Sequence, residues 1–226
     1  MSLFYVAKRT RAEILFPVSY LATFSSKPEQ SHYDKGIIVF RYLFRTINYR
    51  LVHGCKGRSR LNAFIDASYA IHNDAKSHTG GLIFDDRNLI DASSTKHQHM
   101  NKSSTDAEVS GVHNRVNTLE SLRNLLIDLT GIEDPIIAYQ DNKSAMHLMN
   151  EGTSVSNKAN YMKVRYFYVK EKVDEKILYF QYKSTIEMIA DLLTKLLFGE
   201  KFSKFVSYIY NDENIIDCML FISQLH

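Results

Sequence analysis

Residues 61–93 read LNAFIDASYAIHNDAKSHTGGLIFDDRNLIDAS, and this stretch decides the fold class. It contains three apolar runs of strand length, which are Leu61–Asp66, Gly80–Asp85 and Asn88–Ser93. Only Asp86 and Arg87 separate the second run from the third, a spacing typical of a β-hairpin. The stretch therefore predicts three consecutive strands, of which the last two form a hairpin.

The residues that follow alternate between helix and strand patterns. A helix is predicted from Thr105, because Thr105-Asp106-Ala107-Glu108 fits a capping box, and Gly131 stops this region. Two more strands and three more helices are predicted beyond it, at Ile136–Gln140, Asn142–Asn150, Tyr161–Lys172, Ile177–Tyr182 and Thr185–Leu197. This order predicts an α/β (α+β) architecture, in which a mixed five-stranded sheet is covered by helices.

The N-terminal quarter has a different pattern. Apolar residues recur at helical spacing between Pro28 and Ile47, and His53–Gly57 reads as a linker. We therefore predict a helical segment at 1–57, a sheet-containing domain at 58–199 and a helical tail at 200–226.

Composition limits the class of protein. The chain has 226 residues, of which 45% are hydrophobic, and this is enough apolar material for a core. Its longest uncharged apolar stretch, Ile14 to Ser26, contains Pro17 and is too short to cross a bilayer. The N-terminus lacks a signal-peptide pattern, and two distant cysteines suit a reducing compartment. A cytosolic or nuclear protein without a membrane partner is expected.

The net charge of +3 is modest, but the cations are clustered. From Lys35 to Ile65 there are seven cations and no acidic residue. A second cluster lies between Lys158 and Lys172. Such segments can bind phosphates. The alternative is a solvated helix face whose counter-charges come from elsewhere in the fold.

Four acidic residues occupy positions that could converge: Asp66 at the end of a strand, Glu108 on the apolar side of a helix, Asp141 after a strand and Asp191 beside an apolar stripe. Clustered carboxylates must bind cations or protons, and all-oxygen ligands suit hard ions such as Mg²⁺. Each residue also has a simpler explanation. Glu108 could only close its capping box, Asp141 could cap a helix, Asp191 could pair with Lys195, and Asp66 could face solvent.

At these positions the chain resembles the C-terminal part of copia-type retrotransposon Pol polyproteins, where a connection segment precedes a ribonuclease H domain. Residues 3–52 resemble the connection segment. Five motifs in order resemble the ribonuclease H domain, and they are Phe64-Ile65-Asp66-Ala67, Lys76-Ser77-His78-Thr79-Gly80, Ser103-Ser104-Thr105-Asp106-Ala107-Glu108, Asp141-Asn142-Lys143-Ser144-Ala145 and Ala190-Asp191-Leu192-Leu193-Thr194-Lys195. No Tyr-x-Asp-Asp motif is present, so no polymerase site is expected in this chain.

The resemblance implies a metal-dependent endoribonuclease that cuts the RNA strand of RNA–DNA hybrids. It implies Asp66, Glu108, Asp141 and Asp191 as catalytic ligands of two Mg²⁺ or Mn²⁺ ions, with no small-molecule cofactor. The remainder of the polyprotein is an expected partner. The expected location is either the cytoplasm, within a virus-like particle, or the nucleus. The expected nucleic-acid contacts are Ser104, Asn142, Arg58, Arg60, Lys158 and Arg165.

The chain also departs from the family pattern. Phe167 stands where the family has His, and no His occurs between His147 and His226. These changes keep a second hypothesis open, namely a catalytically silent nucleic-acid-binding or scaffold relic. His97 and His99 could suggest a metal pair, but no third ligand is evident nearby, and a surface or loop pair is the preferred interpretation.

Overall fold

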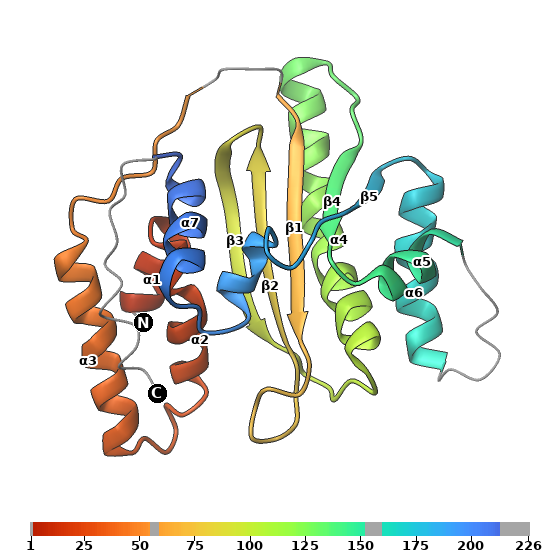
Figure 1. Cartoon of the computed structure of the whole chain (residues 1–226). Helices are drawn as coiled ribbons and strands as arrows, with labels where there is room; N and C mark the ends of the chain where they lie inside the picture. The colour runs from red at the N-terminus through yellow and green to blue at the C-terminus, as the bar shows by residue number, and fades with distance from the viewer. Residues whose placement is uncertain (1, 55–58, 152–159, 213–226) are drawn as a thin grey trace.

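The computed structural model describes residues 2–54, 59–151 and 160–212, and a five-stranded mixed sheet lies at its centre (Figure 1). The strands are β1 (Leu61–Ser68), β2 (His78–Asp85), β3 (Asn88–Lys96), β4 (Ile136–Gln140) and β5 (Leu178–Tyr182), in the spatial order β3-β2-β1-β4-β5. The first three strands are antiparallel neighbours, whereas β4 lies parallel to β1 and β5 lies parallel to β4. The predicted mixed five-stranded sheet is confirmed.

The sheet separates two apolar cores, and the alternation of side chains along β1 explains why. Ala63 and Ile65 pack into one core, and Phe64 packs into the other. All three residues are at most 1% exposed. A strand with both faces buried is apolar at nearly every position, which is the pattern of residues 61–65.

Three helices cover one face of the sheet. They are α4 (Ser104–Thr130), α5 (Lys143–Glu151) and α6 (Asn160–Asp174). Helix α4 ends at Gly131 as predicted, since Gly131 adopts a left-handed conformation with φ of 68°. The predicted capping box from Thr105 to Glu108 is wrong. Ser103 is the N-cap, and its Oγ accepts a hydrogen bond from the Asp106 amide at 3.1 Å.

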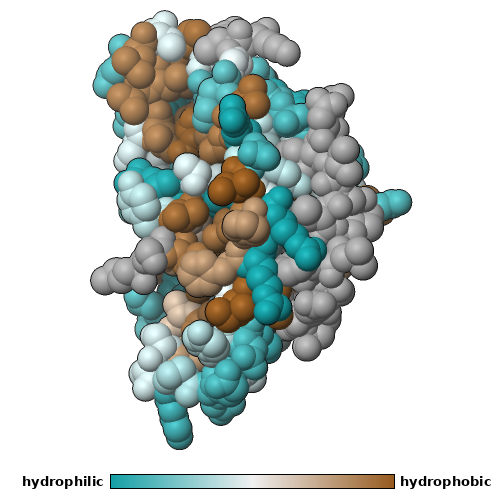
Figure 2. All heavy atoms as spheres, turned by 90° about the vertical axis from the view of Figure 1, so that its left-hand side faces the viewer, coloured by the Kyte–Doolittle hydropathy of each residue, from teal (hydrophilic) through white to brown (hydrophobic). Residues whose placement is uncertain are grey.

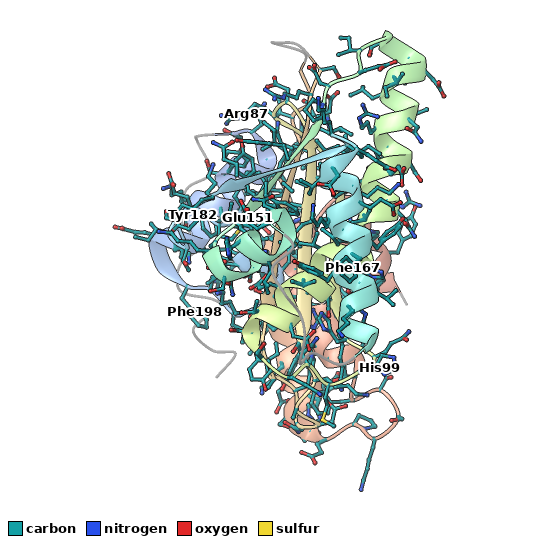
Figure 3. The ribbon with its side chains drawn as sticks, turned by 90° about the vertical axis from the view of Figure 1, so that its right-hand side faces the viewer. Arg87, His99, Glu151, Phe167, Tyr182 and Phe198 are labelled. Carbon is teal, nitrogen blue, oxygen red and sulfur yellow. The ribbon has the colours of Figure 1, made fainter. Side chains whose placement is uncertain are left out.

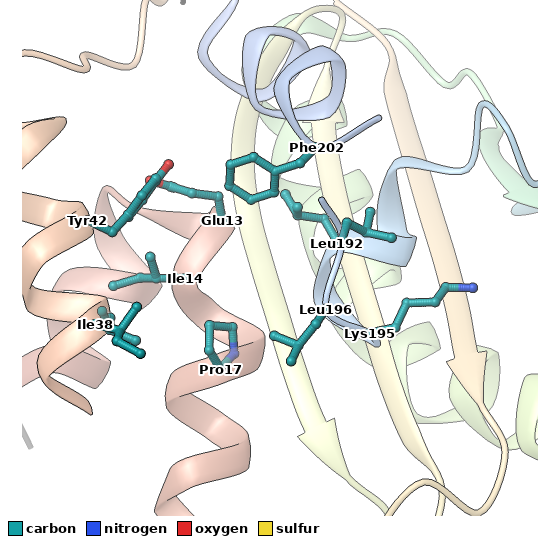
Figure 4. Close-up of a pocket in the computed structure, with 11 residues that line it drawn as sticks. Glu13, Ile14, Pro17, Ile38, Tyr42, Leu192, Lys195, Leu196 and Phe202 are labelled. Carbon is teal, nitrogen blue, oxygen red and sulfur yellow. The ribbon is translucent and has the colours of Figure 1, made fainter. Parts of the chain in front are cut away.

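The other face is covered by elements from both ends of the chain. They are α1 (Ser2–Arg9), the 3₁₀ helix η1 (Ala12–Ile14), α2 (Leu15–Ala22), α3 (Gln30–Arg45), the 3₁₀ helix η2 (Ile189–Leu193) and α7 (Gly199–Tyr210). In Figure 4, Leu192, Leu196 and Phe202 face Ile14 and Pro17 of the N-terminal helices across a small cavity. One apolar core thus joins the N-terminal helices, η2 and α7.

The predicted helix at Thr185–Leu197 is wrong, because only the five residues of η2 are helical there. All five residues are buried, so apolar side chains pack on more than one side of η2 and do not form the single apolar face of a surface helix. The backbone of η2 also lies directly on β2. A Cβ atom at Gly80 would come within 2.8 Å of the Ala190 carbonyl oxygen, so this close approach requires a glycine in β2.

The outer surface of the N-terminal helices carries exposed apolar side chains (Figure 2). A groove there is lined by Val6, Phe40, Leu43, Phe44 and Ile47, together with two arginines. Every helix in the described part of the chain is too short or too polar to span a bilayer. The proposed boundaries near residues 57 and 199 stay predictions.

Candidate metal centre

Three of the four predicted carboxylates meet at one edge of the sheet. Asp66 comes from β1, Glu108 from the first turns of α4 and Asp141 from the residue after β4. Strands β1 and β4 are parallel, and Asp66 and Asp141 each lie two residues beyond the paired residues Phe64 and Tyr139. One oxygen from each of the three carboxylates lies within 4.8 Å of the other two.

Burial makes this cluster unfavourable as three bare anions. Asp66 is 3% exposed and Glu108 is 4% exposed. Burial raises the pKa of Asp66 to about 7, although the nearby Lys195 ammonium opposes the rise. Burial also raises the pKa of Glu108, and the neighbouring Asp66 and Asp141 carboxylates raise it further. The cluster therefore favours whatever brings positive charge into it, either protons or a cation.

Neighbouring polar side chains hold the three carboxylates in place. The Gln140 amide donates to Glu108 Oε2 at 3.1 Å, while its own oxygen accepts the backbone N–H groups of Asp141 and Asn142. The Thr194 hydroxyl donates to Asp66, and the Thr185 hydroxyl donates to Asp141 Oδ2 at 2.8 Å. Gln140 and Thr185 were not singled out from the sequence, because hydroxyl and amide residues beside acidic ones are too common to mark a site.

Asp191 is close to the cluster, but it forms ion pairs with two lysines. It is fully buried, and its Oδ1 and Oδ2 lie 2.7 Å and 2.6 Å from the ammonium groups of Lys195 and Lys201. The metal-type cluster found among the described residues contains Asp66, Glu108 and Asp141 without Asp191. The alternative of an ion pair with Lys195 is therefore confirmed, and a role for Asp191 as a metal ligand stays a prediction.

The other simpler explanations do not hold. Glu108 does not cap α4, since Ser103 does. Asp141 does not cap α5 either, because the Ala145 amide donates to Asn142 Oδ1 at 3.0 Å. Asp66 does not face solvent, since it lies inside β1 and is buried. Neither helix capping nor solvent exposure therefore explains why these three carboxylates lie in the cluster.

The predicted nucleic-acid contacts are scattered. Ser104 is exposed at the start of α4, while Asn142 is engaged in capping α5. Arg60 precedes β1, so six residues of extended chain, about 20 Å, separate it from Asp66. The Arg165 guanidinium donates to Ser110 Oγ at 3.0 Å across the α4–α6 contact. Arg58 and Lys158 lie outside the described residues.

His97 and His99 belong to no metal-type cluster in the part of the chain that the structure describes. His97 is 7% exposed, and its Nδ1 lies 2.7 Å from Asn101 Oδ1, whereas His99 is exposed. Both histidines follow the end of β3 at Lys96, so the interpretation of a loop pair is confirmed, although His97 is buried in a polar network and does not lie at the surface. Phe167, at the position of the family His, is 55% exposed on α6 (Figure 3).

Comparison with known proteins gives one consistent group of relatives. No family model matches the chain. The retrovirus-related Pol polyprotein from transposon RE1 of Arabidopsis thaliana is 29% identical over 202 residues, which are 88% of this chain and 14% of that polyprotein. The corresponding polyprotein from transposon TNT 1-94 of Nicotiana tabacum is 29% identical over 204 residues, 89% of this chain and 15% of its own length.

A more distant relative comes from yeast. The transposon Ty1-DR1 Gag-Pol polyprotein of Saccharomyces cerevisiae is 25% identical over 199 residues, 85% of this chain and 11% of that polyprotein. The chain thus spans well under a fifth of the length of these curated relatives. The resemblance to copia-type Pol polyproteins is confirmed.

Two solved structures are similar to part of the chain at low sequence identity. LC11 ribonuclease H1, isolated from compost, is 18% identical with a TM-score of 0.47, and the match covers 61% of this chain and 94% of that one. The foamy viral protease–reverse transcriptase in complex with an RNA/DNA hybrid is 14% identical with a TM-score of 0.48, covering 81% of this chain and 24% of that one.

Proposed function

We propose that this chain is a metal-dependent endoribonuclease that cuts the RNA strand of RNA–DNA hybrids, and that it acts as part of a copia-type retrotransposon Pol polyprotein. The observation that carries the proposal is the buried cluster of Asp66, Glu108 and Asp141, whose oxygens lie within 4.8 Å of one another. Similarity to Pol polyproteins over most of the chain supports the biological setting.

The donor set fits a hard divalent cation. Carboxylate oxygens are the ligands that Mg²⁺ and Mn²⁺ prefer, and two of the three groups, Asp66 and Glu108, are buried while Asp141 is partly exposed. Asp66, Glu108 and Asp141 would hold the ion. Because the pKa of Asp66 is raised to about 7, a cation that binds there near neutral pH would compete with a proton on Asp66.

A bound divalent ion supplies activation of a water molecule and stabilisation of the leaving oxygen of a phosphodiester. The protein's own residues orient the site. Gln140 fixes the Glu108 carboxylate, Thr194 fixes Asp66 and Thr185 fixes Asp141. No side chain of the protein has to attack the phosphate. Recognition of the hybrid would rest on 2′-hydroxyl and phosphate contacts around this edge of the sheet.

A cleavage assay tests the proposal. A labelled RNA–DNA hybrid is incubated with the full chain and Mg²⁺ or Mn²⁺, beside the Asp141→Asn variant and a control variant, Asp128→Asn, on the exposed side of α4. We expect cutting by the wild type and the control, and none by Asp141→Asn, because one ligand charge is lost while Thr185 can still donate to the amide oxygen.

Two other outcomes would contradict the proposal. Equal cutting by wild type and Asp141→Asn would refute the assigned site. Hybrid that binds but stays uncut with both metals would favour the silent binding module, for which Phe167 in place of a His is the supporting observation. A pull-down of the upstream polyprotein region and imaging in cells would test the proposed partner and the cytoplasmic or nuclear location.

A further inference from the structure

Two lysines from different elements form ion pairs with the Asp191 carboxylate. Lys195 follows η2 and approaches Oδ1 at 2.7 Å, whereas Lys201 lies in the first turn of α7 and approaches Oδ2 at 2.6 Å. In Figure 4, the Lys195 side chain points away from the apolar contacts of Leu192 and Leu196, toward the sheet. Both oxygens of this fully buried carboxylate thus lie at ion-pair distance from a protein cation. Oδ2 accepts a hydrogen bond from Lys201, whereas Oδ1 accepts none from the described residues and is held by the charge of Lys195 alone.

The lysines are also linked to the carboxylate cluster. Lys201 donates a second hydrogen bond to the Thr185 carbonyl oxygen at 2.9 Å, and the Thr185 hydroxyl donates to Asp141 Oδ2. The Lys195 ammonium is close enough to Asp66 for each to shift the other's pKa. Two positive charges therefore border the three clustered carboxylates on the side of Asp191.

Recruiting Asp191 as a metal ligand would be costly in this arrangement. A second ion would have to displace two ammonium groups from a carboxylate that has no access to water, and ion pairs in such surroundings are much stronger than at the surface. The two lysines carry the same total charge as one divalent ion. They compensate Asp191 without any metal.

We propose that Lys195 and Lys201 take the place of a second divalent ion, so that this chain binds one Mg²⁺ at Asp66, Glu108 and Asp141. This inference rests on the proposed function and replaces the two ions that the family resemblance implies. Asp191 is then a positioning residue that holds the two ammonium groups.

Calorimetric titration of the full chain with MgCl₂, and separately with MnCl₂, counts the ions without any substrate. We expect one ion per wild-type chain. The Lys201→Met variant frees Asp191 Oδ2, so we expect two ions and an affinity for the second at least about tenfold above any second binding in the wild type. The matched control is Lys204→Met, an exposed lysine on the same helix, which should bind one ion.

Thermal unfolding provides a second readout. Removing Lys201 leaves a buried carboxylate half paired, so the melting temperature of Lys201→Met should rise more with Mg²⁺ than that of the wild type or Lys204→Met. The number of ions bound by the wild-type chain is measured without any variant. The inference can therefore be refuted even if Lys201→Met does not fold.

The outcomes separate this inference from the proposed function. Two ions per wild-type chain, together with hybrid cleavage, would overturn the inference that the lysines replace a second ion. The proposed nuclease function would still stand. One ion in both the wild type and a folded Lys201→Met would overturn it as well. A wild-type chain that binds no ion would overturn both.

Discussion

Burial of the Asp66 carboxylate makes the stability of the metal-free protein depend on pH. Its pKa is raised from 3.8 to about 7 in the folded chain, with burial as the main cause. The folded state therefore binds this proton more tightly than the unfolded state. Stability is fully present below about pH 4 and is lost as the pH rises toward 7. Three pH units at about 1.4 kcal/mol each give a loss of about 4 kcal/mol.

The Asp66→Asn variant removes this titration while keeping an oxygen that accepts the Thr194 hydrogen bond. Denaturant unfolding in EDTA between pH 4 and pH 8 should show the wild type losing about 4 kcal/mol relative to the variant. The Asp128→Asn control should follow the wild type. Mg²⁺ at pH 8 should restore stability to the wild type and little to Asp66→Asn.

Parallel pH curves for the wild type and Asp66→Asn would refute the reasoning, because they would mean that the Asp66 carboxylate ionises as readily in the fold as in the unfolded chain. Glu108 is present in both proteins, and burial raises its pKa in both. Part of the difference arises because Asp66→Asn also removes the repulsion that raises the pKa of Glu108.

Three further substitutions test the packing around the site. Gly80→Ala should destabilise the fold by about 1–3 kcal/mol in denaturant unfolding, since its Cβ would come within 2.8 Å of the Ala190 carbonyl oxygen. Glu13→Ala should cost about 3–5 kcal/mol in the same measurement, because it leaves the buried Arg11 guanidinium without the carboxylate that lies 2.7 Å away. Ser103→Ala should cost about 1 kcal/mol by removing the cap of α4, with wild-type metal binding in calorimetry.

The sheet could be predicted because its strands are apolar over several residues and are separated by turn residues. The strand ends could not. Strand β1 continues to Ser68, where it pairs with His78 at the start of β2, two residues before the predicted Gly80. His78 is fully buried, and its Nε2 lies 2.7 Å from Ser94 Oγ. Polar residues extend these strands because a distant strand supplies their partners, and sequence alone does not reveal that pairing.

The same limit explains which part of the site could be predicted. Asp66 and Asp141 follow apolar strand patterns and Glu108 shares a helix face with an apolar stripe, so local periodicity places each of them on its element. Their meeting at one edge of the sheet is implied by the family resemblance and not by the spacing. Asp191 was placed on a long helix that does not exist, and Lys201 lies in α7, an element of the predicted tail to which no role was assigned. A carboxylate's partner decides whether it binds a metal or an ammonium group. For Asp191, the partner Lys195 is four residues away and could be predicted, but the second partner, Lys201, depends on how α7 packs against η2, a tertiary contact that leaves no periodic trace in the sequence.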